Sequence, residues 1–245
     1  MPWLQRWLGQ LYSKLYARFE RRLFTYLDAL KVSEMPEAKL SVAFSKLHAG
    51  KALTIFRRSR PRVYRLLDPR SFLLTVSGEV TQQGVKQEQY VQLVYDTFRT
   101  VRSKTTLVSF AVYGSVARGE AEPSSDLDIL LVSDEFHGSL ASRIDSLAWV
   151  DGEVSDELGF LRSHGYRPSI SLYPLRREEA ERLPLLFLDL TEDASIIYDE
   201  AGFLTHTLSQ LSAKLQLMGA KRLRKGNRWY WDLKPSFRFG ELIQI

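Results

Sequence analysis

One stretch, residues 108–132, constrains the fold of this chain more than any other. It opens with an apolar, β-branched and aromatic run that is typical of a buried strand, and the run breaks at Gly114-Ser115. Turn-forming residues around Pro123 precede a second apolar run that ends at Val132. The sequence therefore predicts two buried strands joined by a short turn or helical turn.

Two aspartates, Asp126 and Asp128, lie two positions apart at the start of the second strand. Because strand side chains alternate between faces, both carboxylates are expected on one face, with Cα atoms roughly 6–7 Å apart. Neighbouring carboxylates on an apolar strand repel each other and are costly to bury unless a cation lies between them. Such hard oxygen ligands suit Mg²⁺ or Mn²⁺. The pair is therefore a candidate metal site.

The residues at the end of the first strand suit phosphate binding. Gly114 allows close approach of the backbone to a ligand, and amides at a strand-to-helix turn can hold a phosphate. Ser115 can donate a hydrogen bond to a phosphate oxygen, and Arg118 carries a guanidinium nearby. Together with the carboxylates, this arrangement favours nucleotidyl transfer from a nucleoside triphosphate. The alternative is a helix N-terminus followed by an ordinary solvated aspartate pair.

The stretch resembles the signature of the nucleotidyltransferase superfamily that includes DNA polymerase beta, and in particular its small minimal branch. The clear match covers about 25 residues and includes three groups, Gly114-Ser115, Arg118-Gly119-Glu120 and Ser125-Asp126-Leu127-Asp128. The resemblance implies an α/β (α+β) catalytic domain with a mixed sheet. It also implies a nucleoside triphosphate and Mg²⁺ or Mn²⁺ as cofactors, and transfer of a nucleoside monophosphate to a hydroxyl group.

The resemblance also implies roles for individual residues. Asp126 and Asp128 become the catalytic and metal-binding residues, and the nucleotide-binding positions are Gly114, Ser115, Arg118 and Ser125. The acceptor remains open between a protein hydroxyl, an RNA end and a small molecule. In the minimal branch the target is often a partner toxin with a helical nucleotide-binding domain, so a toxin–antitoxin pair is one expectation.

The sequence departs from the superfamily at the third carboxylate, which is usually on the strand after the long helix. That strand is predicted within residues 168–174, where serines occupy the expected positions. Serine is a weak neutral ligand and cannot act as a base at neutral pH. Either another carboxylate reaches the site, or two carboxylates suffice, or the domain binds nucleotide without turning it over. The candidate replacements are Asp151, Glu153, Asp189 and Asp193.

Composition excludes several other classes of site. The chain has 245 residues and no cysteine, which excludes disulfides, thiolate metal sites and cysteine nucleophiles. Its four histidines are scattered without metal-ligand spacing. The formal net charge of +5 modestly favours a polyanionic partner. No apolar run is long enough for a membrane span or a signal core, so a cytoplasmic location is expected.

The N-terminal region, residues 1–80, is predicted to be a basic helical and winged-helix-like domain. Residues 2–31 carry apolar groups at helical spacing with a basic outer face, which indicates one long helix or two, packed on the protein or lying on a membrane surface. A helix over 38–47 and a strand over 71–77 are also predicted. The segment 51–70 is the most basic part of the chain and is either a solvated basic surface or a site that binds RNA, DNA or an acidic partner.

The remaining chain is divided into a nucleotidyltransferase domain over 81–201 and a C-terminal part over 202–245. Long amphipathic helices are predicted over 81–104 and 136–164, and a helix over 202–218. A hairpin is then predicted around Gly226-Asn227, with a basic and aromatic segment, 221–228, that suits nucleic acid or packs on the body. The missing carboxylate and the basic segments also support a rival function, namely non-catalytic nucleotide or nucleic-acid binding on the same fold.

Overall fold

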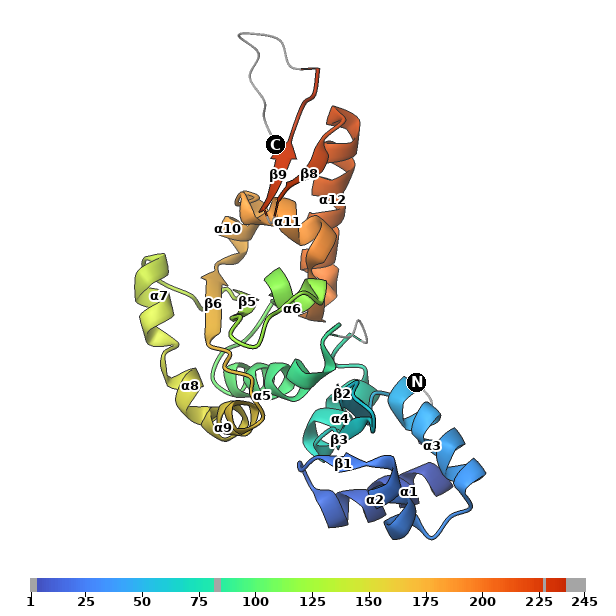
Figure 1. The fold of residues 1–245 in the computed structure, drawn as a ribbon. Helices are drawn as coiled ribbons and strands as arrows, with labels where there is room; N and C mark the ends of the chain where they lie inside the picture. Colours follow the sequence, from blue (N-terminus) through green and yellow to red (C-terminus); the bar gives the residue numbers. More distant parts are fainter. Residues whose placement is uncertain (1–3, 82–84, 227, 237–245) are drawn as a thin grey trace.

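The computed structural model describes residues 4–81, 85–226 and 228–236. A helical N-terminal part lies at one end, a four-stranded sheet lies in the middle, and the last helix and hairpin extend from the other end (Figure 1). One hydrophobic core joins the N-terminal helices to the helices beneath the sheet, since Leu15, Phe98 and Leu161 belong to the same buried cluster.

The N-terminal part has a winged-helix-like order of elements. These are α1 (Arg6–Phe19), β1 (Phe24–Thr25), α2 (Tyr26–Ser33), α3 (Glu37–Ala49), β2 (Leu53–Arg57) and β3 (Val63–Leu66). The three strands form an antiparallel sheet in the order β1-β3-β2. The predicted helices at 2–31 are two, because the chain leaves the helix at Glu20, where φ is 52°.

The apolar side of α1 packs inside the protein. Leu8, Leu11, Tyr12 and Leu15 are all buried in the main core. The predicted strand over 71–77 is wrong, because this segment is helix α4 (Pro69–Ser77). Asp68 caps the helix by accepting a hydrogen bond from the Arg70 amide, Pro69 occupies its first turn, and Gly78 ends it in the left-handed region. These end signals outweigh the apolar run that suggested a strand.

The central sheet has the order β6-β5-β4-β7. Its strands are β4 (Ser109–Tyr113), β5 (Leu127–Val132), β6 (Ile170–Leu175) and β7 (Ser195–Asp199). Strand β4 is antiparallel to β5 and β7, whereas β5 and β6 run parallel. The predicted mixed sheet, and with it the α/β (α+β) fold class, is confirmed.

Helices cover both faces of this sheet (Figure 1). Side chains at Leu127, Ile129 and Leu131 join the core shared with α5 (Val91–Arg102), α8 (Trp149–Glu153) and α9 (Ser155–Ser163). Leu130 and Val132 point the other way, into the core beneath α11 (Leu186–Asp193) and α12 (Phe203–Met218). Strand alternation therefore places Asp126 and Asp128 on the α11–α12 side.

Two predicted long helices are shorter than expected. The helix expected over 81–104 is α5, preceded by the 3₁₀ turn η1 (Glu88–Tyr90). The helix expected over 136–164 is three pieces, α7 (Leu140–Ser146), α8 and α9. Leu147, Val150, Val154 and Leu158 are all buried, so the apolar pattern continues across the breaks as the pieces follow the core. Because the apolar spacing is continuous, it predicts one long helix and does not reveal the breaks between the three pieces.

The remaining elements connect and extend the sheet. They are α6 (Gly114–Arg118), α10 (Arg177–Glu181), η2 (Glu200–Gly202), β8 (Lys221–Lys225) and β9 (Arg228–Asp232). The β8–β9 hairpin was predicted, although Asn227 in its turn lies outside the described residues. Within the described ranges, no helix has the length and apolar character needed to cross a membrane.

Candidate active site

The turn between β4 and α6 brings the glycine of the signature against an aspartate. Gly114 has φ 71°, a left-handed conformation that strains any other residue. A Cβ at this position would collide with the carboxylate of Asp128. Gly114 is therefore required both for the turn and for the close approach of Asp128 to the backbone.

Asp126 and Asp128 lie together where β5 begins. Asp126 is exposed and immediately precedes the strand, whereas Asp128 is partly buried on it. Burial raises the pKa of Asp128 and the charge of Asp126 raises it further, while the Ser171 hydroxyl and the Arg118 guanidinium act in the opposite direction. The predicted pair of carboxylates at the start of one strand is thus present, and its buried member, Asp128, ionises less readily than a free aspartate.

Serines on β6 contact both aspartates. Ser169 donates a hydrogen bond from Oγ to Oδ1 of Asp126. Ser171 is the register partner of Asp128 across the parallel pair, and its hydroxyl lowers the pKa of that carboxyl. The strand that was predicted to lack the third carboxylate is therefore the strand beside the pair. Its hydroxyls occupy the space where a third acidic side chain would reach the site.

Comparison with known proteins identifies the domain that carries this geometry. Residues 96–184 match the model of the nucleotidyltransferase domain family. The chain contains a nucleotidyltransferase domain. The superfamily resemblance of the signature is confirmed, and the matched model is that of a family of nucleotidyltransferase domains. No curated protein matches the chain.

Several solved structures are similar at low identity. A mutant of the MntA–HpeT toxin–antitoxin is 15% identical, covers 50% of this chain and 88% of its own, and has a TM-score of 0.31. A toxin–antitoxin with AMP-PNP is 12% identical over 51% and 92%, with a TM-score of 0.31. The archaeal chromatin protein TrmBL2 is 15% identical over 85% and 92%, with a TM-score of 0.27. At these TM-scores the similarity supports no assignment beyond the family match.

Arg118 of the nucleotidyltransferase domain is held by two carboxylates. Its Nε donates to Glu120 at 3.0 Å, and its Nη1 lies 3.4 Å from Oδ2 of Asp193. Asp193 also accepts a hydrogen bond from Nη2 of Arg222 on β8 at 2.7 Å. Asp193 is therefore engaged by two arginines. Through Asp193, Arg222 of the C-terminal hairpin is linked to Arg118 of the signature. The sequence did not predict this link.

The other proposed replacements for the third carboxylate lie away from the pair or are already engaged. Asp151 and Glu153 are exposed on α8, where Glu153 pairs with Lys104 at 3.5 Å. Asp189 accepts a hydrogen bond from the Trp231 indole at 3.0 Å. Across the described residues, no group of three His, Cys, Asp or Glu side chains is placed to hold a metal ion. The donors at the site are therefore two carboxylates and two hydroxyls, and the charged pair fits Mg²⁺ or Mn²⁺ with coordination positions left for substrate.

The signature serines differ in what they contact. The Ser115 carbonyl accepts a hydrogen bond from the Glu120 amide at 2.9 Å, which closes the α6 turn. Ser125 accepts a hydrogen bond at its Oγ from the Glu122 amide at 2.9 Å, so this hydroxyl shapes the turn before Asp126. Contact of either serine with a nucleotide stays a prediction.

A tyrosine next to the aspartates was not foreseen. Tyr113 ends β4 and is the register partner of Asp128 in the antiparallel pair. Its pKa is raised above the ordinary value by burial, by the Asp128 carboxylate and by Tyr173. The signal was available in the sequence, since Tyr113 directly precedes Gly114. Identifying it requires the strand register, which the sequence alone does not give.

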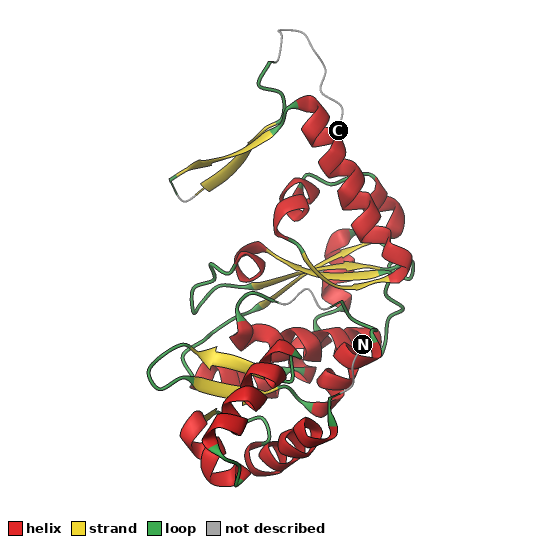
Figure 2. Cartoon of the chain, turned by 90° about the vertical axis from the view of Figure 1, so that its right-hand side faces the viewer, coloured by secondary structure: helices red, strands yellow, loops and turns green. Residues whose placement is uncertain are grey.

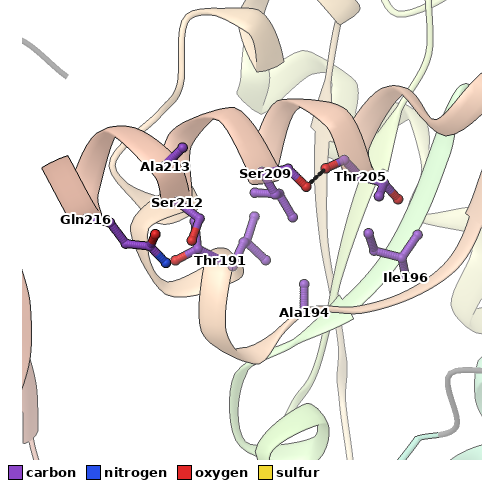
Figure 3. Close-up of a pocket in the computed structure, with 10 residues that line it drawn as sticks. Thr191, Ala194, Ile196, Thr205, Ser209, Ser212, Ala213 and Gln216 are labelled. Atoms are coloured by element: carbon purple, nitrogen blue, oxygen red, sulfur yellow. Dashed lines mark hydrogen bonds between the residues drawn. The ribbon is translucent and has the colours of Figure 1, made fainter.

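Two cavities are formed by elements of the nucleotidyltransferase domain and its neighbours. One, of about 480 Å³, opens where β2 meets the signature loop and is lined by Arg57, Arg58, Lys86, Arg118 and Gly119, among others. The other, of about 380 Å³, lies between α11, β7 and α12 (Figure 3). It is lined by Thr191, Ser209, Ser212 and Gln216 with apolar neighbours, and Ser209 is hydrogen-bonded to the Thr205 carbonyl. Only the first cavity contains residues of the signature.

Proposed function

We propose that the protein transfers a nucleoside monophosphate from a nucleoside triphosphate to a hydroxyl acceptor, with Mg²⁺ or Mn²⁺ held by Asp126 and Asp128. The observation that carries this proposal is the position of the Asp128 carboxylate directly against the Gly114 turn, with Asp126 two positions before it at the start of β5. Carboxylates and a backbone turn in this arrangement can hold a metal–triphosphate between them.

Residues around the Gly114 turn can bind the phosphates of the nucleoside triphosphate. Gly114 and Ser115 open α6, the Gly114 backbone lies against Asp128, and the Ser115 hydroxyl can donate a hydrogen bond to a phosphate oxygen. Arg118 is oriented through Nε and Nη1, and among the described residues no hydrogen bond or ion pair involves its Nη2. We assign this nitrogen to a phosphate oxygen. A bound divalent cation would neutralise triphosphate charge and stabilise the leaving pyrophosphate.

The acceptor hydroxyl must lose its proton without a third carboxylate. Ser169 and Ser171 occupy the neighbouring strand and are not bases at neutral pH. We therefore expect slow transfer, or an acceptor whose own groups assist deprotonation. The acceptor class is a protein hydroxyl, an RNA end or a small molecule. A helical partner protein in a toxin–antitoxin pair is part of this proposal through the resemblance of the signature to the minimal branch.

The test is a labelling reaction with each α-³²P-labelled NTP, Mg²⁺ or Mn²⁺, and cell lysate as the source of acceptor. The wild type is compared with Asp126→Asn and with Asp145→Asn, which changes an exposed aspartate on α7. Label on a protein or RNA band with the wild type and Asp145→Asn, and its loss with Asp126→Asn, supports the proposal. Equal labelling by all three proteins contradicts the assigned site.

A second candidate function is nucleotide binding without turnover. It is favoured by the hydroxyls of Ser169 and Ser171 at the position of the third carboxylate. Calorimetry separates the two functions, because a binding protein would retain NTP affinity while producing no label in any reaction. Absence of both label and binding would mean that the signature serves only as scaffold.

A further inference from the structure

The turn between β2 and β3 is an exposed loop rich in arginine. Arg58, Arg60 and Arg62 are all exposed. No hydrogen bond or ion pair to another described residue involves the side chains of Arg60 and Arg62, and the Arg58 side chain is 74% exposed beside Glu88 at 3.4 Å. Glu88 beside Arg58 is thus the one acid that the described structure pairs with these three arginines. Such a loop is available to a polyanion.

The same loop borders the cavity that contains the signature residues Arg118 and Gly119. Four cations line this cavity of about 480 Å³, and Glu88 is its single acid. The Glu88 carboxylate is already bonded to the Ile55 amide at 2.7 Å and to His48 at 2.9 Å. The cavity is therefore strongly cationic. Arg118 lines it, and the charge of the same arginine lowers the pKa of Asp128.

The β8–β9 hairpin carries a second group of cations, together with exposed aromatic rings. Its base is fixed to α11 by the contacts of Arg222 and Trp231. Beyond this base, Trp229 is 38% and Tyr230 is 48% exposed, and the guanidinium of Arg224 lies 5.3 Å from the Trp229 ring. Large rings left in water on a narrow two-stranded arm contribute little to folding. Their chemistry suits base stacking.

The two basic hairpins are parts of one face. Asp193 accepts from both Arg118 and Arg222, so the cavity and the base of the β8–β9 hairpin meet at one carboxylate. In Figure 2 this hairpin and the loop between β2 and β3 project from the same side of the molecule, above and below the central sheet. A ligand that follows this face passes the signature.

We propose that this face binds single-stranded nucleic acid. The phosphodiester backbone lies along the β2–β3 loop and the cationic cavity, and unpaired bases stack on Trp229 and Tyr230, which lie on the two opposite faces of the β8–β9 arm. A duplex keeps its bases stacked on one another, so it cannot use the aromatic rings in this way. The proposal goes beyond the transfer reaction, because it requires neither metal nor Asp126.

The experiment measures fluorescence anisotropy of a labelled, unstructured oligonucleotide of about 20 nucleotides with the full chain in EDTA. A matched duplex of the same length is measured beside it, and both are titrated at several salt concentrations. Tighter binding of the single strand, weakening with salt, supports the proposal. Tighter binding of the duplex, or no binding at low salt, overturns it.

Substitutions test whether the single strand binds to this face. Replacing Arg58, Arg60 and Arg62 together with alanine should weaken binding at least tenfold and reduce the salt slope by about 2, since each lost phosphate contact on a single strand contributes about 0.7. The matched control replaces three exposed cations elsewhere, Arg162, Arg182 and Lys214. If the control weakens binding as much as the test variant, the effect is net charge alone and the proposal is wrong.

The aromatic rings have their own test. Trp229→Ala and Tyr230→Ala should each weaken single-strand binding at least fivefold, whereas Trp229→Phe and Tyr230→Phe should retain most of the affinity because a stacking surface remains. Unfolding temperatures of all four variants establish that the body stays folded. Alanine variants with wild-type affinity overturn the proposed role of the hairpin. Asp126→Asn should bind as the wild type does, so failure of the transfer proposal leaves this result unchanged.

Discussion

Ser171 lies directly beside Asp128 on the parallel strand β6, and its hydroxyl lowers the pKa of the Asp128 carboxyl. A longer acidic side chain at this position would point to the same side of the sheet as Asp126 and Asp128. The register thus shows where a third carboxylate would stand in this chain. It also shows what replaces it, namely a hydroxyl that stabilises the charged form of Asp128 without adding charge.

Restoring an acid at Ser171 should therefore increase transfer. We predict that Ser171→Asp raises the initial rate of label transfer by about tenfold or more, because a positioned base contributes roughly 10²–10⁴-fold in favourable cases. Without divalent metal the same variant should unfold at a lower temperature, since three carboxylates repel one another. The control is Ser163→Asp, because Ser163 is exposed at the end of α9. A folded Ser171→Asp protein with no gain in rate contradicts the prediction.

Gly114 is the second sensitive position. We predict that Gly114→Ala lowers transfer at least a hundredfold and destabilises the fold by about 1–3 kcal/mol, because φ is 71° and the new Cβ would collide with the Asp128 carboxylate. Gly159→Ala is the matched control, because a Cβ on this α9 residue meets nothing within 4 Å. Equal activity of the two variants would show that the turn tolerates a side chain.

Strand alternation explains how much of the site the sequence could predict. The two-residue spacing of Asp126 and Asp128 fixes their common face, and the turn chemistry of Gly114 is local. The Arg118–Asp193 contact spans 75 residues, and the Arg222–Asp193 contact depends on where the last hairpin docks. Such pairings follow from the tertiary arrangement, which no local pattern encodes.

The same distinction applies to the fold. The core strands were predictable, because apolar runs such as residues 127–132 are buried on both faces of the sheet. Residues 71–77 form a helix, although their apolar run resembles a strand, because the cap at Asp68 and the glycine at Gly78 fix the ends. Short apolar runs are ambiguous between the two structures, and cap chemistry decides.

A buried ion pair joins the N-terminal part to the nucleotidyltransferase domain. Arg65 on β3 and Glu157 on α9 are 3% and 2% exposed and form a two-bond pair, with Nη2 to Oε2 at 2.7 Å. We predict that Glu157→Ala lowers the free energy of unfolding by about 3–5 kcal/mol, because the Arg65 charge is left buried without its partner. Chemical denaturation measures the loss. Asp156→Ala, an exposed neighbour on the same helix, should change stability by less than about 0.5 kcal/mol.

A second ion pair should give the fold a measurable acid dependence. Arg143 on α7 is 4% exposed and binds Glu179 on α10 through two nitrogens, with Nη2 to Oε1 at 3.0 Å. Hydrogen bonding to Arg143 is the main cause that lowers the pKa of Glu179 from 4.5 to about 2. A depressed carboxyl pKa stabilises the folded state above the unfolded value, and this stabilisation is lost as the pH falls from about 4.5 to about 2.

Glu179→Gln should therefore be less stable than the wild type at pH 7 by roughly 2–3 kcal/mol, since a pKa difference of about 2.5 is worth about 3.5 kcal/mol and solvent at the partly exposed Glu179 screens part of it. The difference should shrink as the pH falls below 4.5, because the unfolded wild-type chain then binds a proton at Glu179 that the folded chain, with its carboxyl pKa at about 2, does not bind. Denaturant titrations at pH 7, 5, 4 and 3 measure it, with Glu178→Gln as the control because Glu178 is exposed on the same helix. A stability difference that stays constant from pH 7 to pH 3 would show that the pair does not depend on the Glu179 charge.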